Sequence, residues 1–511
     1  MKSQAASATR QSSPIPLSAM RFAGSIYSQY ALLAMVIAAL LFDLFVVARH
    51  LPPGTDDLMA RISAQSQGLG RMLTLLREQP VNVDAPLFPV LAYWAARLPL
   101  PIDMALRIPS MIALCVAAVV LFLLVRDRLN PGAAYMSTLL LALSPYARFG
   151  AIARPYAIFL VWIALALLCW LRAVEGGPRR RIWLAGLALF STAALLTQYF
   201  APFTLLPIAA GEIFRSRQRR VDWPVWAALT AGLLLFIPIY IAFSPGGAPY
   251  GAHPFTPLNV RELKNSFADA VPADAVAALL IGTGILAIPF RPAPSVRSFF
   301  DYEWLAIVGI ASSPVLLFIA GGIFAHTYSV RHGICAVLGV TIILVSCLHR
   351  AAKERAAILV LLFAAAFAVR QGQILRGARQ PAPSPQAAWA GATPELLQRY
   401  SDLPLVTPDF DYAMRIHFYA PAWLSSRLTM ITNRASMVQF VGTDNPALAA
   451  LAIHRWTGWP LEDYFDFRRR HKRFLMYGVY WMLDALKADG ADIQPLGNLG
   501  PYPLFLVNAP Q

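Results

Sequence analysis

The sequence is dominated by apolar runs that are long enough, or nearly long enough, to cross a lipid bilayer. Hydrophobic residues make up 58% of the 511 residues, and only 14% are charged. A spanning helix needs roughly 20 mostly apolar residues, and helices suit lipid because they satisfy every backbone hydrogen bond internally. We therefore predict an all-α polytopic membrane domain. About eleven runs are candidate spans: Tyr30–Ala48, Ala105–Val125, Gly132–Ser144, Tyr156–Leu171, Ile182–Thr197, Phe200–Phe214, Trp223–Phe243, Ala273–Phe290, Trp304–Phe324, Ile334–Leu348 and Ala356–Val369.

The charges between these runs predict the orientation of the chain. There are 43 Lys and Arg against 27 Asp and Glu, and the basic residues gather in short clusters between spans. This pattern is typical of cytoplasmic loops in a bacterial inner membrane protein, and it disfavours a nucleic-acid partner. With residues 1–29 as a cytoplasmic tail, every second loop is basic. These inner loops are Arg126–Asn130, Arg172–Arg181, Arg215–Asp222, Arg291–Asp301 and His349–Arg355.

The chain changes character after residue 370. We expect a membrane domain over 30–370 with a large first outer loop over 49–104. A Pro/Ala-rich linker is expected over 371–394, and a lobe over 395–511. In this last part, we expect strands at "LPLVTPD", "RLTMIT", "RFLMYGVY" and "YPLFLV", which alternate with helices at "PELLQRY" and "WMLDALKADG". Such alternation predicts a small α/β lobe, which an odd number of spans places on the periplasmic side.

Two adjacent acids, Asp56 and Asp57, follow directly on the first span in "LPPGTDDLMARIS". Helix-forming residues come next, so both carboxylates lie near a helix start, where acids are favourable caps. The alternative is a reactive carboxylate at the membrane–water boundary, acting as a general base. The spacing alone leaves both interpretations open.

The stretch "SPYARFGAIARPYAIF" places Arg148 and Arg154 on the outer side, against the orientation rule. Because Pro155 disfavours a helical conformation at the preceding residue, Arg154 is expected in a turn just before the span that begins at Tyr156. An arginine there either pairs with lipid phosphate or holds the phosphate of a leaving group, to which a guanidinium can bind in bidentate fashion.

Two further outer turns carry polar residues. "LLTQYFAPF" contains Gln198 and Tyr199, and "AHTYSVRHG" contains Arg331 and His332. Each alone is ordinary for a membrane interface, where aromatic and basic residues are common. Acids, arginines and tyrosines from separate segments nevertheless emerge on one face, which predicts a common site.

Taken in order, these stretches resemble the GT-C superfamily of membrane glycosyltransferases. The closest resemblance is to the branch that contains lipopolysaccharide-core galacturonosyltransferases, aminoarabinose transferases and protein O-mannosyltransferases. The resemblance covers roughly residues 30–370, and the predicted lobe over 395–511 is also of the kind expected in this superfamily. The matching stretches are "TDDLMA", "VDAPLFPVL", "ALRIPSMIAL", "LALSPYARFGAIARPYAIF", "LLTQYFA" and "SVRHGI".

The resemblance implies a polyprenyl-phosphate-linked sugar as the donor. By position, Asp56 matches the family's first acid, which deprotonates the acceptor, and Asp57 replaces a glutamate. Arg154 and Tyr156 match the "RPY" of the family, and Arg331 matches a later arginine. The two arginines are the implied ligands of the donor phosphate.

The remaining motif positions differ from the family pattern. A His-Pro-Pro motif is replaced by Asp84-Ala85-Pro86, a His-Tyr pair by Gln198-Tyr199, and an Arg-Tyr pair by Arg331-His332. These differences leave the sugar and the acceptor open. No His/Asp spacing on a helix forms a ligand set, and a divalent metal ion stays open as an alternative.

The predicted function is therefore transfer of a hexose or pentose from a polyprenyl-phosphate carrier to a periplasmic acceptor, with inversion. Lipid A, the lipopolysaccharide core, another lipid or a polysaccharide could accept it. Three alternatives stand beside it: a transporter or flippase of lipid-linked sugars, a non-catalytic scaffold with this fold, and a paired-carboxylate hydrolase.

Overall fold

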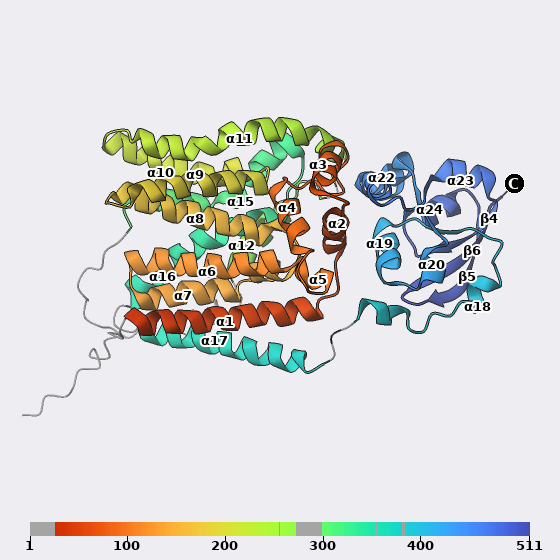
Figure 1. The fold of residues 1–511 in the computed structure, drawn as a ribbon, viewed down its shortest axis with the longest axis horizontal. Helices are drawn as coiled ribbons and strands as arrows, with labels where there is room; N and C mark the ends of the chain where they lie inside the picture. Colours follow the sequence, from red (N-terminus) through yellow and green to blue (C-terminus); the bar gives the residue numbers. More distant parts are fainter. Residues whose placement is uncertain are drawn as a thin grey trace, which may run out of the picture.

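The computed structural model consists of a bundle of long helices and a smaller α/β lobe at one end of it (Figure 1). The lobe is joined to the bundle through the segment that follows the last long helix. The structure describes residues 26–254, 256–271, 299–352, 356–380, 382 and 384–510.

Helices occupy every predicted span that lies within the described residues. The predicted span Ala273–Phe290 lies outside them. The helices at these spans are α1 (Ile26–His50), α6 (Ile108–Arg128), α7 (Pro131–Leu143), α8 (Pro155–Glu175), α9 (Arg180–Thr197), α10 (Ala201–Gln218), α11 (Trp223–Gly247), α14 (Asp301–Ala311), α15 (Ser313–Ala320), α16 (Ala336–Ala352) and α17 (Ala356–Ala378).

Six of the described helical segments are long and apolar enough to cross a membrane. The count is seven if α14 and α15, which meet at an angle of 54°, form one broken span. The chain is thus a multi-pass membrane protein. Helices α7, α9 and α10 fall outside this count, and with them the total of eleven spans stays a prediction.

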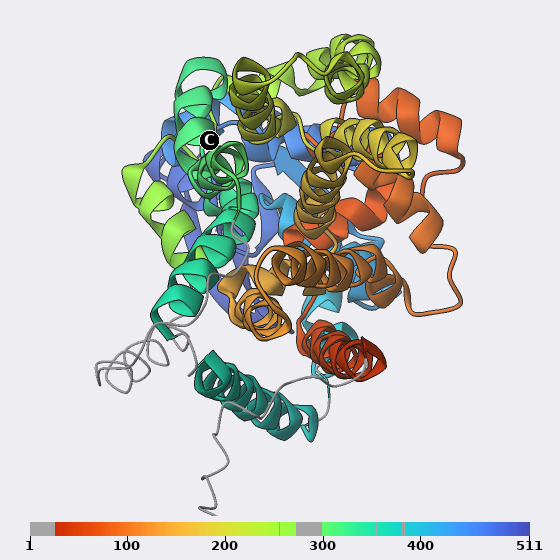
Figure 2. The ribbon, with the colours of Figure 1, turned by 90° about the vertical axis from the view of Figure 1, so that its left-hand side faces the viewer.

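The bundle is seen along its helices in Figure 2, where α1 and α17 lie at its lower edge. An ion pair joins these two helices, because the buried carboxylate of Asp43 in α1 lies 3.6 Å from the guanidinium of Arg370 in α17. A charge inside lipid is costly, and pairing reduces that cost. Helix α17 continues to Ala378, so the first part of the expected linker is helical.

Short helices cover the end of the bundle that faces the lobe (Figure 1). Four of them come from the segment predicted as the first outer loop, and five come from later parts of the chain. These elements are α2 (Thr55–Ala64), α3 (Leu69–Glu78), α4 (Leu87–Ala95), α5 (Ile102–Ala105), η2 (Pro145–Ala151), η3 (Ala248–Gly251), α12 (Val260–Ala270), η4 (Gly321–Ala325) and η5 (Val330–Cys335).

The lobe contains a six-stranded sheet with the order β3-β2-β1-β4-β6-β5. The first four strands in this order are parallel, and β6 and β5 are antiparallel to their neighbours. The strands are β1 (Leu405–Thr407), β2 (Leu428–Thr432), β3 (Leu461–Asp463), β4 (Arg473–Tyr477), β5 (Asp492–Leu499) and β6 (Tyr502–Asn508).

Helices pack on both faces of this sheet, because alternate strand residues point to opposite sides. Leu405 and Leu475 belong to one hydrophobic core, and Val406 and Met476 to the other. The lobe helices are η7 (Pro385–Trp389), α18 (Glu395–Gln398), α19 (Phe410–Tyr419), α20 (Ala422–Ser425), α21 (Arg434–Val441), α22 (Asn445–Thr457), α23 (Tyr464–Arg470) and α24 (Trp481–Ala488). The region is therefore mixed α/β, with four strands where the sequence predicted them and two, β3 and β5, that it did not indicate.

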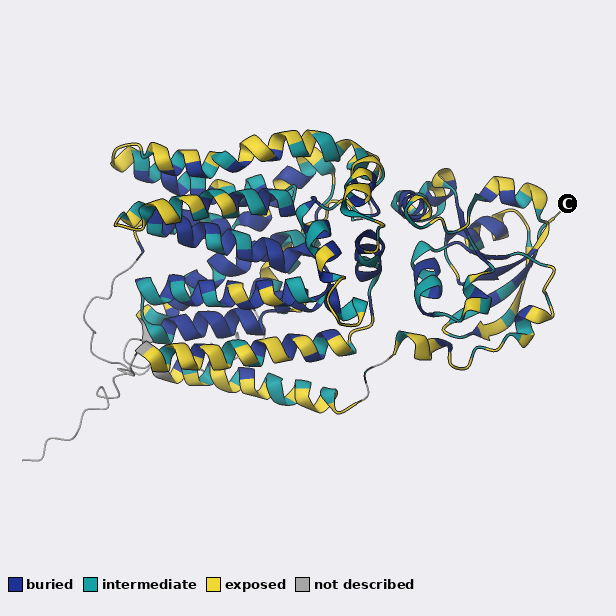
Figure 3. Cartoon of the chain, in the orientation of Figure 1, coloured by how far each residue is buried: buried dark blue, intermediate teal, exposed yellow. Residues whose placement is uncertain are grey.

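Helix α2 belongs to two cores at once. Ala60 and Ala64 pack in the core of the bundle, whereas Leu58, Met59 and Ile62 pack in a core of the lobe. Figure 3 shows α2 as a buried element between the two parts. The end of the bundle and the lobe thus share one short helix.

One glycine in the lobe is required for two reasons. Gly478 follows β4 with φ +85°, and a Cβ there would lie 2.4 Å from the ring of Tyr412. We expect Gly478→Ala to destabilise the lobe by about 1–3 kcal/mol. Gly490→Ala is the control, because Gly490 has φ +72° but open space around it. Hydrogen exchange at the β4 amides of the full chain measures both losses, and equal losses would contradict the steric argument.

Candidate functional site

Asp56 lies in the first turn of α2, directly after the first long helix. Two prolines and Gly54 precede the helix, and Gly54 is extended with φ −77° and ψ 168°. Prolines cannot continue α1, so the chain turns before α2 begins. The side chain of Asp56 is 37% exposed and forms ion pairs with both Arg154 and Arg331, the latter at 3.7 Å.

Arg154 is buried and reaches two carboxylates. It is extended at the N-cap of α8, with Pro155 as the first helical residue, as the sequence predicted. Ser110 Oγ donates a hydrogen bond of 2.9 Å to the Arg154 carbonyl and thereby fixes its backbone. The guanidinium pairs with Asp56 and lies 3.5 Å from Asp84. Burial acts to lower the pKa of Arg154, but Asp56, Tyr156 and Asp84 together raise it above its usual range.

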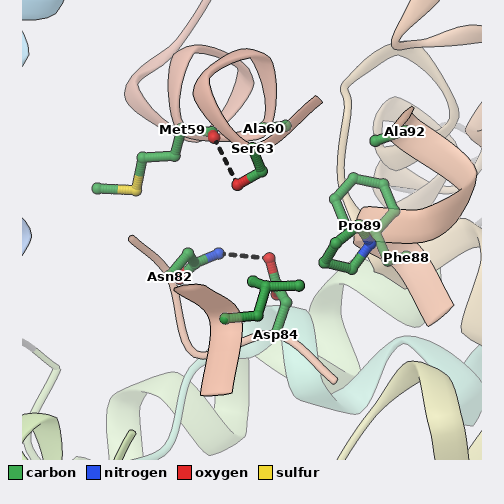
Figure 4. Close-up of a pocket in the computed structure, with 9 residues that line it drawn as sticks. Met59, Ala60, Ser63, Asn82, Asp84, Phe88, Pro89 and Ala92 are labelled. Carbon is green, nitrogen blue, oxygen red and sulfur yellow. Dashed lines mark hydrogen bonds between the residues drawn. The ribbon is translucent and has the colours of Figure 1, made fainter. Parts of the chain in front are cut away.

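Asp84 is the second carboxylate at this guanidinium. Asn82 Nδ2 donates a hydrogen bond of 2.7 Å to its Oδ2. Burial raises the pKa of Asp84, although Arg154 acts to lower it. The side chain borders a small hollow between α2, α3 and α4, together with Ser63 and several apolar residues (Figure 4). Asp84 therefore connects the charged cluster with a partly apolar recess.

Arg331 enters the site from η5 on the other side of Asp56. Its side chain is 34% exposed, and its guanidinium lies 5.9 Å from the centre of the Tyr156 ring. A second small hollow lies beside Arg331. It is lined by Tyr156, Phe159, Gln198, Phe200, Arg331 and His332.

Four more residues singled out in the sequence have defined places. Tyr156, Gln198 and His332 meet around this second hollow. Tyr199 does not line it, and its ring packs edge-on against Tyr240 at 5.5 Å between ring centres. The structure thus brings the outer turns together, and the predicted role of Tyr199 in substrate binding stays a prediction.

Asp57 differs sharply from its neighbour. Its side chain is only 5% exposed. Its Oδ2 accepts hydrogen bonds from the backbone N–H of Gly54 at 3.0 Å and from Arg107 at 2.8 Å. Its Oδ1 accepts a bond of 2.7 Å from the backbone N–H of Ala153. The bond from Gly54, the N-cap residue of α2, is a helix-capping interaction. Asp57 therefore has the capping geometry that was one of the two interpretations of the sequence.

Two contributors were not recognised as site residues from the sequence. Arg107 holds Asp57, and Asn82 holds Asp84. Arg107 lies in "LRIPS", where a buried arginine had no visible partner in the sequence, and Asn82 lies two residues before Asp84. Among the described residues there is no group of three His, Cys, Asp or Glu side chains placed to hold a metal ion.

The Asp57–Arg107 pair is expected to carry stability. Removing one partner of a buried ion pair leaves an uncompensated charge and costs about 3–5 kcal/mol. We therefore expect Asp57→Asn to lower the thermal stability of the detergent-solubilised protein strongly. Glu78→Gln, which breaks an exposed pair with Arg455, is the control and should cost about 1 kcal/mol or less. Equal stability of the two variants would contradict the assignment.

The chain is similar to one protein family and to several solved structures. Residues 85–241 match the family model described as dolichyl-phosphate-mannose-protein mannosyltransferase. No curated protein matches the chain significantly. Among solved structures, ArnT from Cupriavidus metallidurans bound to undecaprenyl phosphate superposes with a TM-score of 0.55 at 13% identity, over 94% of this chain and 98% of that chain.

Two other matches have lower scores. ArnT in the apo state gives a TM-score of 0.47 at 12% identity, with the same shares of both chains covered. The apo oligosaccharyltransferase of Archaeoglobus fulgidus gives 0.44 at 12% identity, over 89% of this chain and 70% of that chain. Residues 85–241 are thus similar to this mannosyltransferase family, and the chain as a whole shares the fold of ArnT.

Proposed function

We propose that this protein transfers a sugar from a polyprenyl-phosphate carrier to an acceptor hydroxyl at the periplasmic face of a bacterial inner membrane. The observation that carries the proposal is the contact of Asp56 with two guanidiniums, those of Arg154 and Arg331, at one end of the bundle. Such a transfer needs a proton acceptor and a positive charge that binds the phosphate. Here the Asp56 carboxylate lies next to the Arg154 and Arg331 guanidiniums. The basic loops between spans support the periplasmic assignment of this end.

The donor is assigned to the side of Arg331. This guanidinium is partly exposed and adjoins a hollow that contains Phe159 and Phe200. A guanidinium binds phosphate in bidentate geometry, and the apolar rings suit the start of a polyprenyl chain. The solved ArnT structure with undecaprenyl phosphate supports a lipid phosphate of this class. Gln198 and His332, on the same hollow, are proposed to contact the sugar or the phosphate.

Asp56 is the proposed general base. It takes the proton of the acceptor hydroxyl while the acceptor oxygen bonds to the anomeric carbon and the bond from that carbon to the phosphate oxygen breaks. The leaving phosphate retains the bonding electron pair, and Arg154 and Arg331 stabilise its negative charge. Attack from the face opposite the phosphate inverts the anomeric centre. Arg154 is already held by Asp84, so its position does not depend on the donor.

Asp57 is proposed to position the site and not to react. Its two oxygens are occupied by Gly54, Arg107 and Ala153, so an acceptor hydroxyl has no free oxygen there. Asp84 is proposed to accept hydrogen bonds from the substrate at the recess shown in Figure 4. Lipid A, the lipopolysaccharide core, another lipid and a polysaccharide are the acceptor classes to test.

The decisive variant is Asp56→Asn. Loss of a general base lowers turnover by about 10²–10⁴-fold, and the amide keeps the shape of the side chain. We expect the transfer of sugar from a labelled undecaprenyl-phosphate donor to membrane glycolipids to fall by this factor. Mass spectrometry of the glycolipids measures the transfer, and the amount of variant protein inserted in the membrane should be unchanged. Near-normal turnover would refute the assignment of the base. Lipid flux in vesicles without sugar transfer would point instead to a transporter, and the absence of both to a scaffold.

A second experiment addresses the phosphate. Removing a charge-assisted hydrogen bond costs about 1.5–3 kcal/mol, so Arg331→Ala should weaken binding of undecaprenyl phosphate by about 10–100-fold. Arg148→Ala is the matched control, because Arg148 is 60% exposed and pairs with Asp269 instead of Asp56. Titration of both variants with the labelled lipid measures the difference. Identical affinities would remove Arg331 from the donor site.

A further inference from the structure

The lobe contacts the two residues on either side of Gly54, immediately before Asp56. Thr55 Oγ1 donates a hydrogen bond of 2.8 Å to Asp411 Oδ1. Arg415 Nε lies 2.8 Å from the other oxygen, Asp411 Oδ2, and Arg415 Nη1 donates a bond of 3.0 Å to the Pro53 carbonyl. Asp411 and Arg415 lie in α19 and therefore hold the turn that leads into α2 from the lobe side.

The same two helices are joined again at their other ends. Arg61 of α2 donates hydrogen bonds to Asp103 at 3.2 Å and to the Tyr419 hydroxyl at 3.3 Å, and that hydroxyl donates to Asp103 at 2.8 Å. The Arg61 guanidinium also lies 4.1 Å from the centre of the Phe418 ring. Because α19 contacts both ends of α2, it restrains both the position and the direction of the helix that carries Asp56.

These contacts differ from the exposed ion pair that also joins the lobe to the bundle. Arg455 pairs with Glu78 at 2.8 Å, but both side chains are about half exposed and lie at the end of α3. In contrast, the side chains of Asp411 and Arg415 are only 20% and 25% exposed. Partly buried charged hydrogen bonds restrain geometry better than exposed pairs, which contribute little.

We infer that Asp411 and Arg415 are positioning residues for the reaction, which set the place of Asp56 through Thr55 and Pro53. The inference rests on the proposed role of Asp56 as the base. Helix α2 has ten residues, and so short a helix has little stability of its own. Turnover therefore requires that the lobe is in contact with α2. Misplacing a reacting group by about 1 Å can cost about 10²-fold in rate.

The test uses the full chain with four single variants, Thr55→Val, Thr55→Ser, Asp411→Ala and Arg455→Ala, and one double variant. We expect Thr55→Val and Asp411→Ala to lower kcat about tenfold or more, with the KM for the donor unchanged. Thr55→Ser keeps the hydroxyl and should retain near-normal kcat. Arg455→Ala breaks only the exposed pair and should behave as the wild type. The double variant Thr55→Val/Asp411→Ala should be no slower than the slower single variant, because both remove one interaction.

Hydrogen exchange at the amides of residues 58–61 is the second readout. It should become faster in Thr55→Val and Asp411→Ala, but not in Arg455→Ala. Normal kcat in Thr55→Val and Asp411→Ala, or an equal loss of kcat in Arg455→Ala, would overturn the inference. If Asp56→Asn is inactive in the same assay, the proposed function is unaffected by that result. Full turnover by Asp56→Asn would instead overturn the proposed function, and this inference with it.

Discussion

The hydrogen bonds of the Asp57 carboxylate hold together the segments that form the candidate site. It binds the backbone ahead of α2, the backbone ahead of α8 and the side chain of Arg107, and these three segments are far apart in the sequence. A buried carboxylate that accepts several hydrogen bonds and one ion pair is stable only when all partners stay in place. Asp56 and Arg154, each adjacent to one of the anchored backbones, are brought together as a consequence.

The charges around Asp56 are arranged unequally. Arg154 is buried and held by Asp56 and Asp84, whereas Arg331 is partly exposed and adjoins a hollow with aromatic walls. One guanidinium is therefore fixed before any substrate binds, and the other remains available to a ligand. In the proposed transfer, this arrangement would lower the reorganisation needed when negative charge develops on the departing phosphate.

The lobe and the bundle are not independent parts around this site. Leu58, Met59 and Ile62 of α2 belong to a core of the lobe, while Ala60 and Ala64 of the same helix belong to the core of the bundle. The alternation follows from the helical period, since residues three and four apart share a face. The helix that carries Asp56 is consequently stabilised from two sides, and polar contacts from α19 are added at both of its ends.

Much of this could be predicted from local sequence. Apolar runs located the helices of the bundle because their length is set by the bilayer. Pro155 placed Arg154 at a helix start, and "RLTMIT" and "RFLMYGVY" located β2 and β4. In contrast, β5 was not recognised, because it is mostly exposed and contains Pro495 and Gly497, so no alternation marks it.

The sequence by itself determined a polytopic helical protein, a small α/β lobe and a set of polar residues on one face. Only the tertiary structure decided which of two adjacent aspartates is buried. Neighbouring residues on a helix point about 100° apart, and the partner that selects between them, Arg107, comes from the turn before α6. The contact of Asp411 and Arg415 with the turn before Asp56 likewise joins residues more than 350 positions apart, and no local pattern can encode it.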